Sequence, residues 1–197
     1  MKQDFFEHGC FYHVYNRGNN SEDIFKEEKN YEYFLMLLKK YVLPVADVYA
    51  YCLLKNHFHL LVRIKEEKEI TCSDKMRAKP HLGFSHLFNT YTQSVNKLYN
   101  RTGSLFQEHL KRKRITDDIY LIQSIAYIHL NPVKHCFTTD LDYPHSSYKA
   151  MLSNKPTMLK RDEVMYYFED KENFIYWHDF QRIKHQEILM LIDEDID

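Results

Sequence analysis

The sequence predicts one α+β domain, with a ferredoxin-like antiparallel sheet that carries helices on one face and is followed by short C-terminal helices. Segments rich in β-branched and aromatic residues alternate with segments whose apolar residues recur at helical spacing. The 197 residues are 44% hydrophobic, with only 4 Gly and 5 Pro, which is the composition of a globular domain with a sizeable core.

The first half of the chain predicts three strands and one helix. Residues 11–15 are aromatic and β-branched and precede a polar turn, which is typical of a strand. Apolar residues at helical spacing predict a helix over 31–42, which Pro44 ends. Residues 45–54 and 58–64 are separated by three residues only, so we expect them to form an antiparallel hairpin.

The next segments complete the order of a split βαβ domain. Residues 65–83 are polar and predict a loop, whereas 84–99 keep the helical period. A strand over 105–115 and a helix over 117–131 follow, and we expect Pro132 to end this helix. The first six elements are therefore strand, helix, strand, strand, helix and strand.

The charge divides the chain into two parts. Residues 1–159 hold 22 Lys and Arg against 17 Asp and Glu (+5), and residues 160–197 hold 5 against 11 (−6). We interpret 1–159 as the functional domain and 160–197 as an acidic helical extension, with helices at 163–168 and 174–191, that is not an independent domain. We expect this extension to pack on the body, because four of its aromatic residues need burial: Phe168, Phe174, Tyr176 and Trp177.

The sequence argues against membrane and secretory classes. The longest apolar run, Val48–Leu54, has seven residues, and the first twenty residues contain no apolar signal core. We therefore expect a cytoplasmic protein. The four cysteines form no C-x-x-C pair and are interpreted as reduced thiols.

Two patterns carry chemistry. His57 and His59 flank Phe58 at the start of a predicted strand, so both imidazoles share one face and form a two-ligand metal clip; exposed strand histidines are the simpler alternative. On the helix over 117–131, Tyr127 lies on a polar face opposite the apolar residues, and Asn131 follows one turn later on that face.

In their order along the chain, five stretches resemble HUH-type single-strand DNA nucleases, and most closely the REP-associated tyrosine transposases among the single-tyrosine transposases. Lys55 and Lys134-His135 depart from the family pattern without removing a catalytic group. The stretches are YHVYNRGNN (12–20), AYCLLKNHFHLLV (50–62), GSLFQEHLKRKRI (103–115), YIHLNPVKH (127–135) and SSY (146–148).

The resemblance implies a transposase that cleaves and rejoins single-stranded DNA carrying a hairpin. In it, His57, His59 and Asn131 would bind a divalent metal, Mg or Mn in use, and Tyr127 would form a 5′-phosphotyrosine bond. The relatives work as monomers or homodimers. Candidate DNA contacts are Arg17, Lys134 and the basic cluster Lys111, Arg112, Lys113 and Arg114; an ordinary solvated face is the alternative for the basic residues.

Two other functions stay open. A domesticated relative would bind hairpin DNA without cutting it, and the near-neutral sequence pI of 6.9 is compatible with that function. A water-using metal nuclease would need the two histidines and leave Tyr127 without a role. Replacement of Tyr127 by Phe separates the three functions.

Overall fold

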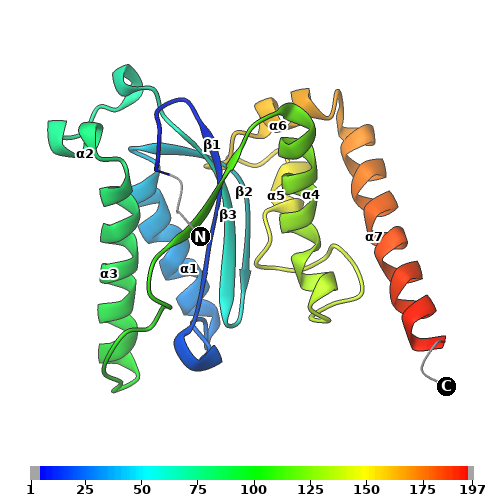
Figure 1. The fold of residues 1–197 in the computed structure, drawn as a ribbon, viewed down its shortest axis with the longest axis horizontal. Coiled ribbons are helices and arrows are strands. Elements are labelled where there is room, and N and C mark those ends of the chain that lie inside the picture. Colours follow the sequence, from blue (N-terminus) through cyan, green and yellow to red (C-terminus); the bar gives the residue numbers. More distant parts are fainter. Residues whose placement is uncertain (1–4, 195–197) are drawn as a thin grey trace.

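The computed structural model describes residues 5–194, with the side chains of 5–184. Its centre is a four-stranded antiparallel sheet in the order β2-β3-β1-β4 (Figure 1). This is the order that the ferredoxin-like prediction requires, with the first and third strands in the middle. The strands are β1 (Phe11–Arg17), β2 (Ala46–Leu54), β3 (His57–Ile64) and β4 (Lys111–Ile115).

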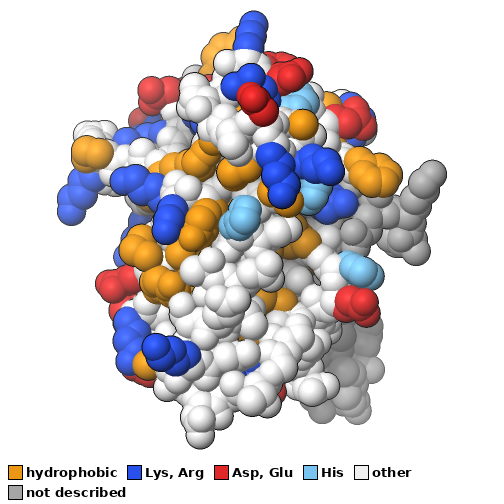
Figure 2. Space-filling view, turned by 90° about the vertical axis from the view of Figure 1, so that its left-hand side faces the viewer, with side chains coloured by type: hydrophobic (Ala, Val, Ile, Leu, Met, Phe, Trp, Pro, Cys, Tyr) orange, Lys and Arg blue, Asp and Glu red, His pale blue; other side chains and the backbone are white. Residues whose placement is uncertain are grey.

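Two helices cover one face of the sheet, as predicted. They are α1 (Glu28–Leu37), which a π-helical turn extends over Leu38–Val42, and α3 (His81–Leu98). The ring of Phe58 on β3 packs between these helices, 5.3 Å from Phe34 and 5.4 Å from Phe88 between ring centroids. Figure 2 looks onto the α3 side, where Lys and Arg side chains lie in several separate groups with acidic and hydrophobic side chains between them.

The opposite face of the sheet carries α4 (Asp118–Lys134), which packs on β2 and β3. The helix α7 (Lys171–Glu194) packs on the side of α4 that faces away from the sheet (Figure 1). The short helices α5 (Tyr148–Leu152) and α6 (Arg161–Tyr167) belong to the same layer. The sheet is therefore sandwiched between helices, which explains why β2 is buried along almost its whole length. The predicted helices on one face of the sheet correspond to α1 and α3. The prediction did not include a helical layer on the other face.

Several segments differ from the sequence prediction. The segment 65–83 is more regular than a loop, with a 3₁₀ turn at Glu67–Glu69 and the short helix α2 (Asp74–Ala78). A further 3₁₀ turn lies at Asn19–Ser21. Within the predicted strand over 105–115, the continuous strand starts at Lys111, and Phe106 forms only an isolated antiparallel bridge with Gly18. The β2–β3 turn contains two residues where three were predicted.

The prediction that Pro132 ends α4 is wrong. The helix runs through Pro132 to Lys134, and Cys136, with a φ of 57°, closes it in the left-handed conformation. The amide of Phe137 donates to the carbonyl of Pro132 at 2.8 Å and that of Cys136 to Val133 at 3.1 Å, which is a Schellman motif. Proline removes one donor from the helix, but burial of this last turn outweighs the loss.

The C-terminal extension packs on the body as expected, with one exception. Phe168 and Phe174 are buried and Trp177 is half-buried, whereas Tyr176 is 68% exposed. Helical geometry accounts for the difference, because residues 176 and 174 are 200° apart around the axis. In the part of the chain that the structure describes, no helix is long and apolar enough to cross a membrane.

Candidate active site

The two histidines of β3 lie where the strand pattern predicts them. Their rings are 5.3 Å apart between centroids on the α4 side of the sheet, and Phe58 points to the other side. The register pairs Arg17 with His57 and Tyr15 with His59. Because paired residues of antiparallel strands share a face, β1 places its odd-numbered side chains beside the imidazoles.

Each imidazole is held through its Nδ1 atom. Nδ1 of His59 lies 2.8 Å from Nε2 of His13, and Nδ1 of His57 lies 2.7 Å from Oδ1 of Asn56. The amide oxygen accepts only, so His57 carries its proton on Nδ1. Its Nε2 atom then presents a lone pair, which is the state of a metal-binding histidine whose other nitrogen is fixed by a second residue.

Asn131 completes the site from α4. Its side chain is fully buried, and Oδ1 lies 3.4 Å from Nε2 of His57. Two acceptor atoms thus face each other at a distance that suits two ligands on one cation, since metal–ligand distances of about 2.1 Å separate neighbouring ligands by about 3 Å. Among the described residues no three His, Cys, Asp or Glu side chains converge as a metal site, so the third protein ligand would be this amide.

The electrostatics keep both imidazoles neutral at pH 7. Burial, then the neighbouring His135, lowers the pKa of His57 to about 4, while the Asn131 amide acts in the raising direction. Burial and the adjacent His13 lower the pKa of His59 well below its ordinary value, again against a raising contribution from Asn131. Neutral imidazoles are the metal-binding form. The donor set, two imidazoles and an amide oxygen, therefore fits a divalent metal.

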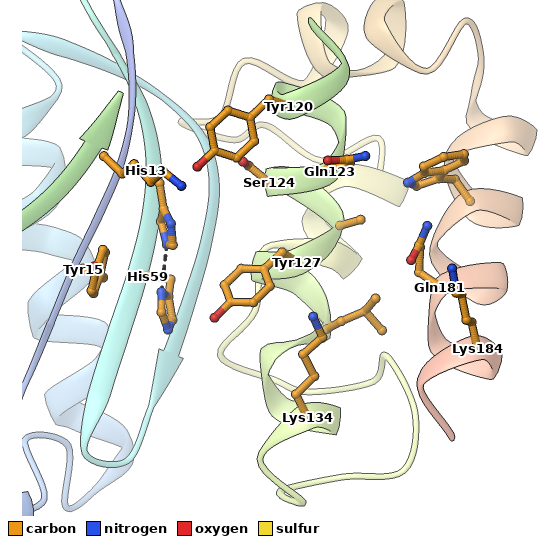
Figure 3. A pocket seen from close by; sticks show the side chains of 14 residues that line it. His13, Tyr15, His59, Tyr120, Gln123, Ser124, Tyr127, Lys134, Gln181 and Lys184 are labelled. Carbon is orange, nitrogen blue, oxygen red and sulfur yellow. Dashed lines mark hydrogen bonds between the residues drawn. The ribbon is translucent and has the colours of Figure 1, made fainter. Parts of the chain in front are cut away.

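Tyr127 lies beside His13 and His59. It is 39% exposed, and its ring is edge-on to those of His13 and His59, with both centroids 5.8 Å away (Figure 3). Nζ of Lys134, two turns further along α4, lies 4.3 Å from the centre of the Tyr127 ring, and burial lowers the pKa of this lysine. The sequence places Tyr127 and Asn131 on one helix face, and the structure turns that face toward the sheet.

The extra turn of α4 brings His135 to the site as well. Its ring lies 4.9 Å from that of His57 between centroids. With Arg17, His57, Tyr127 and Lys111 it lines a cavity of about 220 Å³ at the end of the sheet. Arg17 is therefore close enough to the site to contact a phosphate group bound there.

The predicted basic cluster does not act as one surface. Lys111 and Lys113 pair with Tyr15 and His13 across β1 and line the cavities beside Tyr127. The two arginines alternate to the other face of the strand. There Arg112 lies over the ring of Phe6, at 4.7 Å, and Arg114 forms a 2.9 Å ion pair with Glu7.

Sequence reasoning did not assign His13, Asn56 or His135. His13 could be found from the strand pattern, since it alternates with Tyr15 on one face of FYHVY. Asn56 directly precedes His57, but its contact depends on the turn geometry. His135 follows Pro132, and a helix that ends at Pro132 gives no position for the His135 ring relative to the site.

The comparisons with known proteins bear on the fold. No family model and no curated protein matches the sequence. Among solved structures, the chain is similar to a REP-associated tyrosine transposase bound to a REP hairpin, with a TM-score of 0.60 and 16% identity over 79% of this chain and 87% of that chain. At this identity the likeness shows a shared α+β fold, so the chemistry of the site has to be argued from its own residues.

Proposed function

We propose that this protein is a metal-dependent transposase that cleaves and rejoins single-stranded DNA at hairpin ends, with Tyr127 as the nucleophile. One observation carries the proposal: the Tyr127 ring lies edge-on to His59, and the same site holds His57 and the buried amide oxygen of Asn131. The hairpin bound by the structural neighbour supports the choice of substrate.

Each group in the site has a role in this chemistry. A divalent metal, Mg or Mn, held by His57, His59 and Asn131 would neutralise negative charge on the scissile phosphate. Arg17, Lys111 and Lys113 would hold the DNA backbone around that phosphate. Lys134, above the Tyr127 ring, would stabilise the phenolate that attacks.

The reaction exchanges one phosphoester bond for another and needs no external energy source. The Tyr127 oxygen loses its proton and forms a bond to phosphorus, while the bond from phosphorus to the 3′-oxygen of the preceding nucleotide breaks. The products are a 5′-phosphotyrosine and a free 3′-OH. A 3′-OH that later attacks the same phosphorus reverses the step and joins strands, since the phosphodiester energy is kept in the tyrosine ester. The chain would do this as a monomer or a homodimer, in the cytoplasm.

The test uses labelled hairpin DNA with single-stranded flanks from the protein's own genomic surroundings, with Mn or Mg. Tyr127→Phe should bind this DNA as the wild type does and lose cleavage completely. Tyr120→Phe is the matched control, because Tyr120 lies on the same helix and lines the same cavity but is two turns from Tyr127. It should keep cleavage.

Other outcomes assign other functions. Cleavage that survives in Tyr127→Phe indicates a nuclease that uses water at His57 and His59. Binding without cleavage in the metal-loaded wild type indicates a domesticated hairpin-binding protein.

A further inference from the structure

A cavity of about 730 Å³ lies beside Tyr127, on the side away from the hairpin turn of β2 and β3. Its walls come from the sheet, from α4 and from α7 (Figure 3). This volume falls within the range of sites that bind small organic ligands. The proposed scissile phosphate occupies only the part near the histidines, so the rest of the cavity has no assigned ligand.

The lining has the chemistry of a nucleotide site. Lys113, Lys134 and Lys184 bring positive charge from the sheet, α4 and α7, and the described lining residues include no carboxylate. Aromatic side chains, Tyr15, Tyr120 and Trp177, alternate with these cations. Cations with interleaved aromatic rings are how proteins hold the backbone and bases of single strands.

The α7 wall is basic although α7 belongs to an acidic segment. Trp177, Gln181 and Lys184 line the cavity, and their spacing puts them within about 60° of one another around the helix. Asp179 lies about 140° or more from all three and pairs with Arg182 on another face. The acidic residues of α7 that the structure describes are thus kept off the cavity.

The same helix is fixed to the nucleophile helix by buried hydrogen bonds. Nδ1 of His178 donates to the carbonyl of Phe174 at 2.7 Å, so its Nε2 accepts from Nδ1 of His129, at 2.9 Å. Nε2 of His129 then accepts from the hydroxyl of Ser147 at 2.7 Å. Both imidazoles are fully buried, and the chain of bonds leaves each satisfied. This fixes α7 as a rigid wall.

We propose that α7 binds the DNA strand next to the scissile phosphate, with Lys184 on a backbone phosphate and Gln181 hydrogen-bonded to the neighbouring nucleotide. Trp177 and Tyr120 provide the aromatic surface for its base. The proposal rests on the proposed function, because it takes single-stranded DNA as the ligand, and it makes the acidic extension part of the substrate site.

Binding is measured by fluorescence anisotropy with two DNAs, a hairpin with a single-stranded flank and the same hairpin without it. Lys184→Glu should weaken binding of the flanked hairpin about tenfold. The slope of log affinity against log salt concentration should fall by about 1, and the affinity for the bare hairpin should stay the same. Gln181→Ala should act in the same direction. Lys39→Glu is the control, since Lys39 is exposed on the α1 side of the sheet.

Trp177 is the only tryptophan of the chain and reports on the same wall. Its fluorescence should change when the flanked hairpin binds and stay constant with the bare hairpin. Equal affinities of Lys184→Glu and wild type for the flanked hairpin, with constant Trp177 emission, would overturn the proposal while leaving the transposase function intact. If the wild type binds neither DNA, the proposed function itself fails.

Discussion

His13 offers a sharp test of the metal site, because its Nε2 atom lies 2.8 Å from Nδ1 of the proposed metal ligand His59. Burial, and then the charge of Lys113, lowers the pKa of His13 to about 4, so the ring is neutral. In the tautomer that leaves Nε2 of His59 free for a metal, Nδ1 of His59 donates its proton to Nε2 of His13. In His13→Leu this acceptor is lost. The buried N–H of His59 is then unpaired unless the proton moves to Nε2, which is the nitrogen that binds metal.

The size of the effect follows from that choice. Leaving a buried donor unpaired costs about 1–3 kcal/mol. If the proton moves to Nε2 instead, it has to move back to Nδ1 before the metal can bind, and this step lowers the metal affinity. Loss of such a supporting residue typically lowers metal affinity about 10- to 100-fold, or about 1.4–2.7 kcal/mol, and we expect His13→Leu to fall in this range.

Calorimetric titration with Mn²⁺ at pH 7.5 measures the affinity. His13→Gln keeps an oxygen that can accept from His59, so it should recover most of the affinity that His13→Leu loses. Tyr127→Phe should bind Mn²⁺ as the wild type does. Wild-type affinity in His13→Leu, or an equal loss in the Gln and Leu variants, would refute the assignment of His13 as the residue that orients His59.

Three further predictions concern the ligands and the stability of the fold. Asn131→Ala should lower Mn²⁺ affinity at least tenfold in the same titration, because it removes the amide oxygen 3.4 Å from His57. Burial lowers the pKa of His178 to about 4, so its stabilising contribution is complete above about pH 6.5 and is lost as the pH falls toward 4. The pKa values of His13 and His57 are lowered in the same way, so urea unfolding at pH 4.5 should show at least about 2–3 kcal/mol less stability than at pH 7, and His178→Gln should reduce this difference by about 2–3 kcal/mol. Gly83→Ala should destabilise the protein by about 1–3 kcal/mol in thermal unfolding, because the added Cβ would lie 2.5 Å from the backbone oxygen of Tyr41.

The sequence was sufficient for the elements whose pattern is local. Strand alternation placed His57 and His59 on one face, and helical period placed Tyr127 and Asn131 together. These are short-range consequences of backbone geometry, and the structure confirms both arrangements. The strand order also followed, since the ferredoxin-like order of elements admits few topologies.

What the sequence could not predict depends on contacts between distant segments. The helix α4 continues through Pro132 because it is buried against β2. This continuation brings the His135 ring to His57. The net charge of residues 160–197 predicts an acidic tail, but α7 packs on α4 and places Lys184 in the lining of the cavity. Averages over a segment do not show which residues a helix presents to a site.

The proposed function requires that Tyr127 itself becomes covalently attached to DNA. Incubation of the protein with a flanked hairpin and Mn²⁺, followed by denaturation, nuclease digestion and mass spectrometry of the peptides, tests it directly. We expect a nucleotide 5′-phosphate on the peptide that contains Tyr127, and no such adduct in Tyr127→Phe. Cut DNA with unmodified Tyr127, or an adduct on another residue such as Tyr120, would contradict it.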